Sequence, residues 1–152
     1  MIKVLYKIFL AIMIALFIGF GISVFYPAPE APEFSASYEI QKTEQMSAEQ
    51  IAQQKKFDQD QKNFQEASAK YNRNISAIAI GISVLLLILS LLVLPEIEIM
   101  SDGTLFGGLL TLVYGMIRGM MSNDSKFQFI VVSIGLVIVL VLGYVKFIRK
   151  KS

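Results

Sequence analysis

Residues 75–94 read ISAIAIGISVLLLILSLLVL, an apolar run of 20 residues without a charged side chain. At about 1.5 Å per residue, a helix of this length crosses a hydrocarbon core about 30 Å thick. Within lipid a spanning segment must satisfy its own backbone N–H and C=O groups, which favours a helix. The run therefore predicts a transmembrane helix.

Three further apolar stretches accompany this one. They fall within residues 1–26, 104–121 and 129–147. The middle stretch is marginal because it holds four glycines and Arg118, although both features occur in membrane helices. A re-entrant or surface helix is the alternative there. We expect an all-α membrane protein with four transmembrane helices, the third marginal, and a long polar helix continuous with the second.

The composition agrees with this expectation and excludes several kinds of site. Of the 152 residues, 55% are apolar, and the mean hydropathy of +0.59 is too high for a soluble domain of this size. Without cysteine or histidine, the chain has no disulfide, thiolate metal site or histidine-dependent triad. The net charge of +2 gives no argument for nucleic acid. We expect no enzyme activity, no cofactor and no nucleic-acid partner.

Basic residues at both ends of the chain predict its orientation. They are Lys3, Lys7, Lys146, Arg149, Lys150 and Lys151, the last three within the basic tail at residues 148–152. Because cytoplasmic segments carry an excess of Lys and Arg, both termini are predicted to be cytoplasmic, in a plasma or inner membrane. Two cytoplasmic ends require an even number of crossings, which favours the third span. The middle hairpin alone favours the opposite orientation, since residues 95–103 are acidic and basic residues precede the second span.

The first 26 residues also have features of a secretory signal, because two lysines precede an apolar run. The run exceeds the usual h-region of about 7–15 residues, and no small-x-small cleavage site follows it. Prolines 27, 29 and 32 stand there instead. An uncleaved anchor is the preferred interpretation.

Residues 27–74 form the one long polar stretch. With both termini cytoplasmic, this stretch and the short loop at 122–128 are predicted to be external, and the acidic turn at 95–103 is predicted to be cytoplasmic. Residues 27–46 begin with prolines and predict an extended stalk, although alternation from Phe34 to Gln41 also suits a strand that would need a partner chain. No glycine or proline then interrupts the chain before Gly81. We expect one helix over 47–94, in which residues 47–74 form an arm about 40 Å long with a possible hinge at 71–74.

Three aromatic residues mark one side of this arm. Phe57, Phe64 and Tyr71 recur every seven residues, a spacing typical of a coiled-coil seam or of contact with another helix. Polar residues at the intervening seam positions make the coiled-coil pattern weak. A solvated arm and an arm that binds a second copy or another membrane protein both remain open.

Small residues recur at every fourth position in two of the spans. They are Ala11, Ala15, Gly19 and Ser23 in the first, and Gly107, Thr111, Gly115 and Gly119 in the third. Because lipid supplies no hydrophobic drive between helices, close packing over small residues is expected to hold them together, within one bundle or between subunits. Ser76, Ser83 and Ser90 share one face of the second span. Tyr114 is expected to bond to Ser83, Thr111 or a backbone carbonyl.

These features predict a non-enzymatic, multi-pass structural or interaction component of the cell envelope. The alternatives are a small oligomeric pore of the holin kind and an accessory subunit of a membrane complex. Charged residues are nearly absent from the spans, which counts against a hydrated pore or a coupled transporter. The carboxylates at 96, 98 and 102 fit an interfacial turn better than a metal site. The expected surroundings are a lipid bilayer.

Overall fold

The computed structural model describes residues 1–32 and 48–148, and within them the chain is helical without a strand. Four helices are long and apolar enough to cross a membrane. They are α1 (Ile2–Phe25), α2 (Ala48–Ile88), α3 (Glu98–Met120) and α4 (Ser125–Gly143). Short π-helical segments, η2 (Leu89–Val93) and η3 (Tyr144–Ile148), extend α2 and α4. The predicted all-helical fold with four helices of spanning length is confirmed.

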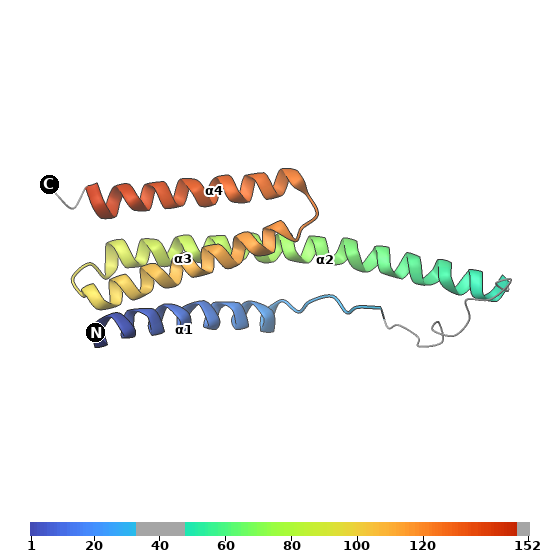
Figure 1. Ribbon diagram of the computed structural model, residues 1–152, viewed down its shortest axis with the longest axis horizontal. Coiled ribbons are helices and arrows are strands. Elements are labelled where there is room, and N and C mark those ends of the chain that lie inside the picture. The colour runs from blue at the N-terminus through green and yellow to red at the C-terminus, as the bar shows by residue number, and fades with distance from the viewer. Residues whose placement is uncertain (33–47, 149–152) are drawn as a thin grey trace.

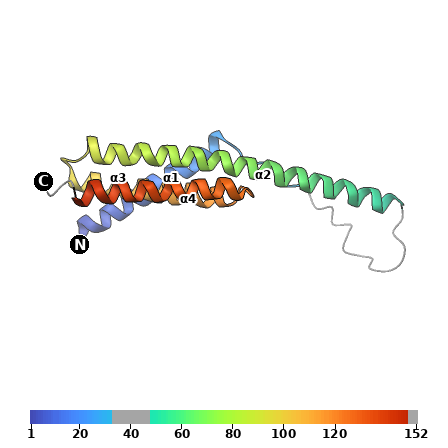
Figure 2. The ribbon, with the colours of Figure 1, turned by 90° about the horizontal axis from the view of Figure 1, so that it is seen from above.

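The helices form one bundle in which α3 is central. It packs chiefly against α1 and α2, whereas α4 packs more sparsely along its outer side (Figure 1). The N-terminus and the end of α4 lie at the same end of the bundle, and α2 continues far beyond the opposite end (Figures 1 and 2). Large apolar side chains such as Phe17 and Leu140 are exposed on the outside, as lipid-facing residues would be.

The row of small residues on α3 forms the centre of the bundle. A Cβ built on Gly107 would lie 3.0 Å from Ile14 of α1, and one built on Gly115 would lie 3.0 Å from Ile80 of α2. Four residues advance an ideal helix by one full turn and about 40°, so the row drifts around α3 from α1 towards α2. The row stays buried along its whole length because α1 and α2 both pack against α3. Thr111 and Gly119 are buried in the same row.

The equivalent row on α1 drifts out of the bundle instead. Ala11 is buried, Ala15 is half-buried, and Ser23 is exposed. A Cβ built on Gly19 would meet no heavy atom within 4 Å. α1 has only α3 as a major neighbour, so the same rotation carries its row towards the outside. The buried face of α1 continues through Ile18 and Ile22.

Several helices begin earlier than the apolar runs suggest. α1 begins at Ile2, ahead of the run, and α3 begins at Glu98, so the turn expected at 95–103 is shorter. α4 begins at Ser125 because the Asp124 carboxylate caps it, accepting from the backbone N–H groups of Lys126 (3.0 Å) and Phe127 (3.2 Å). Polar residues can join a helix when caps or neighbouring helices satisfy them.

α2 passes through residues 71–74 as an unbroken α-helix, so the possible hinge there is not observed. The helix begins at Ala48, and its first turns project from the bundle as the predicted arm (Figure 2). Of the predicted stalk, residues 27–32 are described and carry no regular structure. The remainder of the stalk, the alternative strand at 34–41 and the beginning of the helix at Ser47 lie outside the described residues.

Candidate functional site: polar clusters at the ends of the bundle

Arg118 joins the end of α3 to the base of the arm. Its Nε donates to the Tyr114 hydroxyl at 3.2 Å, and its Nη1 donates to Oδ1 of Asn72 at 3.1 Å. The guanidinium also lies over the rings of Tyr71 (5.9 Å) and Tyr114 (5.5 Å). The expected partner of Tyr114 was a serine, a threonine or a carbonyl. The actual partner is an arginine, which turns into the bundle rather than towards headgroups.

α1 reaches the same place through Tyr26. The rings of Tyr26 and Tyr71 stack with centroids 5.4 Å apart, and Asn74 Nδ2 donates to the Tyr26 hydroxyl at 2.7 Å. Such aromatic pairs contribute about 0.5–1.5 kcal/mol beyond their buried area. Side chains of α1, α2 and α3 therefore meet where the arm leaves the bundle. We call this set the arm clamp: Tyr26, Tyr71, Asn72, Asn74, Tyr114 and Arg118.

A second polar cluster closes the opposite end. Asp102 Oδ2 lies 2.6 Å from Lys7 Nζ, and its Oδ1 lies 2.7 Å from Lys146 Nζ. Glu98 also lies near Lys7, with its Oε1 3.8 Å from Lys7 Nζ. One carboxylate on α3 thus joins α1 to η3. We call Lys7, Asp102 and Lys146 the terminal clasp.

The clasp uses two of the basic residues predicted to set the topology. Lys3 is exposed, and Arg149, Lys150 and Lys151 lie outside the described residues. Lys7 and Lys146 are 95 and 44 residues from Asp102, which is why no local sequence pattern indicates the clasp.

Buried hydroxyl groups between α2 and α3 donate mostly to backbone oxygens. Ser83 donates to the Gly108 carbonyl at 2.9 Å, and Thr111 donates to the Gly107 carbonyl at 2.8 Å. Ser76, Ser83 and Ser90 are all fully buried on the face towards α3. Among the described residues, the buried Oγ atoms of Ser76 and Ser122 have no hydrogen-bond partner. On this face, Ser83 and Ser90 therefore fasten α2 and η2 to α3.

The aromatic residues of the arm are placed differently from one another. Tyr71 is buried in the arm clamp, whereas Phe57 and Phe64 are half-buried farther out. Tyr71 is thus committed to contacts within the chain.

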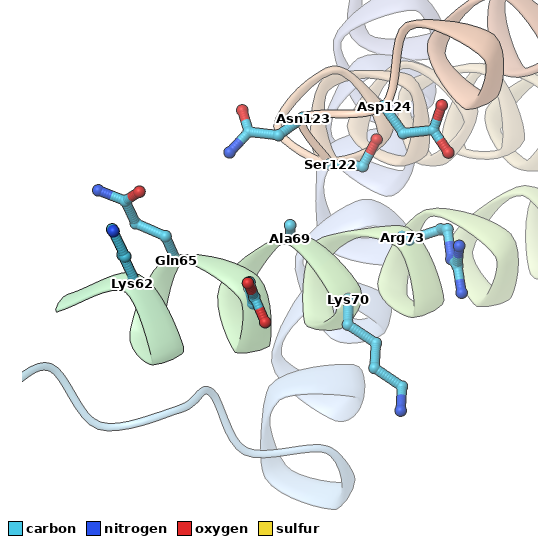
Figure 3. Close-up of a pocket in the computed structure, with 9 residues that line it drawn as sticks. Lys62, Gln65, Ala69, Lys70, Arg73, Ser122, Asn123 and Asp124 are labelled. Atoms are coloured by element: carbon cyan, nitrogen blue, oxygen red, sulfur yellow. The ribbon is translucent and has the colours of Figure 1, made fainter. Parts of the chain in front are cut away.

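A polar pocket of about 460 Å³ lies between the base of the arm and the α3–α4 turn (Figure 3). Lys62 and Gln65 extend on the side of Asn123, whereas Lys70 extends to the other side (Figure 3). Its basic and acidic side chains do not converge on one point. In the described ranges, no group of three or more His, Cys, Asp or Glu side chains is placed to hold a metal ion.

Comparison with known proteins gives no relative: no protein-family model, curated protein or solved structure matches the chain.

Proposed function

We propose that this chain is a non-enzymatic, multi-pass structural or interaction component of the cell envelope. It holds a helical arm on the outer side of a plasma or inner membrane and keeps both termini in the cytoplasm. The observation that carries this proposal is the continuity of α2 from the bundle into the arm, with the arm clamp at the junction.

A clamped arm is suited to holding a partner at a fixed distance from the membrane. From Ala48 to Tyr71 the helix rises about 35 Å at about 1.5 Å per residue. A helix already rigid before binding loses less conformational entropy on binding, which increases affinity. The described part of the arm beyond the clamp is mostly exposed and polar, as a surface for a soluble or extracytoplasmic partner would be.

The distribution of charge supports the proposed orientation. Lys3, Lys7 and Lys146 belong to the end of the bundle that holds the N-terminus and the end of α4, and the arm projects from the other end (Figure 1). The basic tail follows directly in the sequence. By the positive-inside rule this end faces the cytoplasm.

The placement of ionisable groups supports a non-enzymatic role. In the four helices such groups stand in the arm, the arm clamp or the terminal clasp, or close to helix ends. A proton relay or hydrated pore would need polar groups at mid-depth that remain free to contact water or ions. The mid-depth hydroxyls of Ser83 and Thr111 are instead bonded to backbone carbonyls.

Within the membrane, α1 offers a surface for a second helix. The row of small residues reaches the outside at Gly19 and Ser23, and the open space above Gly19 would allow another backbone to approach closely. The partner is a second copy of this chain or another membrane protein, to which this chain would then be an accessory subunit.

Photo-crosslinking in native membranes tests the proposal. A crosslinking residue replaces Phe64 in one variant and Lys55 in another, because these positions lie on opposite sides of the helix at about 100° per residue. We expect a discrete product of higher mass from at least one face, with a yield that falls when Arg118→Ala loosens the clamp. Arg73→Ala, an exposed change on the same stretch, is the matched control.

Two outcomes would contradict the proposal. One is monomer alone from both faces of the arm. The other is a robust ion conductance from the purified protein in liposomes, which would favour an oligomeric pore.

A further inference from the structure

A cleft of about 530 Å³ opens between η2, the first turns of α3 and η3, at the end of the bundle that holds the termini. Its volume falls within the range of about 300–1,000 Å³ typical of ligand sites. In this region α4 diverges from α3 (Figure 1). The cleft is distinct from the arm and from the pocket of Figure 3.

Residues of two π-helical segments line this cleft. Leu91 belongs to η2, and Val145 and Lys146 belong to η3. π-Helical turns are rare and occur frequently at functional sites. These two turns are 51 residues apart in the sequence, from the end of η2 at Val93 to the start of η3 at Tyr144, and both line one cleft.

The cleft has a mostly apolar wall and a charged mouth. Ile88, Leu91 and Val145 line the wall, together with the buried Ser90 and Ser101, whose hydroxyls are hydrogen-bonded to each other's carbonyls. Ile88 is 47% exposed, so the opening lies on the lipid-facing side. Lys146, Asp102 and Glu98 stand at the mouth. The Lys146 ammonium has three donors, and its hydrogen bond to Asp102 uses one of them. A cation with unused donors beside an apolar wall matches a phosphate that glycerol links to an acyl chain.

We propose that this cleft binds one membrane phospholipid, with the phosphate on Lys146 and one acyl chain between Leu91 and Val145. Lipid is the material that meets a laterally open apolar cleft in a bilayer. Immediately around the mouth, Lys7 and Lys146 balance Asp102 and Glu98 in charge, so recognition rests on the phosphate that all glycerophospholipids share. Anionic and zwitterionic phospholipids are therefore bound with similar affinity.

Native mass spectrometry of the delipidated full chain in mild detergent tests this site. The probes are phosphatidylglycerol, phosphatidylethanolamine and diacylglycerol with identical palmitoyl and oleoyl chains. We expect one phospholipid to be retained, with about tenfold weaker retention of diacylglycerol, which lacks the phosphate.

Two pairs of variants separate the interior of the cleft from its mouth. Val145→Phe fills the interior and should lower retention about tenfold, whereas Leu136→Phe, a similar change on the exposed face of α4, should not. Lys146→Gln should lower retention about tenfold and Lys146→Arg should restore it, whereas Lys126→Gln at the other end should have no effect. Unchanged elution and helicity show that each variant is folded.

Three results would overturn the proposal. The first is equal retention by Val145→Phe and Leu136→Phe. The second is equal retention of diacylglycerol and phospholipid. The third is retention of phosphatidylglycerol alone that high salt abolishes, which would assign binding to surface attraction by the basic tail.

Discussion

Ser90 and Ser101 exchange hydrogen bonds across the interface of η2 and α3. The Ser90 hydroxyl donates to the Ser101 carbonyl at 2.6 Å, and the Ser101 hydroxyl donates to the Ser90 carbonyl at 2.9 Å. Both residues are buried. These two hydrogen bonds fix η2 against α3 close to the turn that joins them. If either helix shifted along its axis, Asp102 would be displaced from the terminal clasp.

Replacing either serine by alanine should weaken this interface. We expect Ser90→Ala and Ser101→Ala each to lower the free energy of unfolding by about 0.6–1.7 kcal/mol, the range for hydrogen bonds between membrane helices. Because the two hydroxyls also lie 3.4 Å apart, the effect of the double variant should differ from the sum of the single effects by about 0.5 kcal/mol or more. Unfolding in mixed micelles, followed by circular dichroism, measures both. Ser23→Ala is the control, since Ser23 bonds only within its own helix, to Phe20.

The two rows of small residues should respond differently to a large side chain. Gly115→Leu places its Cβ 3.0 Å from Ile80 and 3.2 Å from the Ile80 backbone nitrogen, so α2 and α3 must separate. We expect a loss of about 1–3 kcal/mol of unfolding free energy or a failure to assemble. A Cβ at Gly19 meets no heavy atom within 4 Å, so Gly19→Leu should leave the fold of the monomer intact. Equal stability of the two variants would contradict the central position of α3.

Removing Arg118 should loosen the arm without unfolding the bundle. Arg118→Ala leaves the buried Asn72 side chain without its partner, at a cost of about 1–3 kcal/mol. Lys should not restore the clamp, because it lacks the planar guanidinium. Spin labels on cysteines placed at Lys55 and Asn123 report the arm–bundle distance, since the chain has no native cysteine. Arg118→Ala should broaden that distance distribution and Arg73→Ala should not; identical distributions would show that the clamp does not hold the arm.

Asp102 should matter more to the terminal clasp than either lysine. Asp102→Asn removes the charge that holds both Lys7 and Lys146, whereas Lys7→Gln or Lys146→Gln leaves one ion pair in place. We therefore expect the largest fall in Tm from Asp102→Asn. Glu98→Gln should change Tm little, because Glu98 is 80% exposed and 3.8 Å from Lys7. A larger effect of Glu98→Gln than of Asp102→Asn would contradict this account of the clasp.

The sequence was sufficient to predict the helices of spanning length and the arm. A long uncharged apolar run has few structural options in lipid, and a glycine-free polar stretch readily continues it as helix. The row on α3 and the row on α1 have the same spacing, however, and only the number of neighbouring helices decides which of them stays buried. That number depends on how the four helices pack in three dimensions. The spacing of residues along one helix does not specify that packing.

The two polar clusters were beyond prediction for a similar reason. Arg118 and Asn72 are 46 residues apart, and each looks ordinary near the end of its own segment. An arginine at such a position suggests contact with headgroups. The rings of Tyr71 and Tyr114 give its guanidinium an internal surface instead, which only the folded arrangement reveals.

The central claim is that the arm lies on the external side of the membrane and both chain ends lie in the cytoplasm. Labelling of single cysteines with a membrane-impermeant maleimide tests this claim most directly. Lys55→Cys places the thiol on the arm, and Lys3→Cys places it near the N-terminus; both positions are exposed. We predict that intact cells label Lys55→Cys at once and label Lys3→Cys only after the membrane is permeabilised. Labelling of Lys3→Cys in intact cells, with Lys55→Cys protected until lysis, would contradict the proposed orientation of the arm.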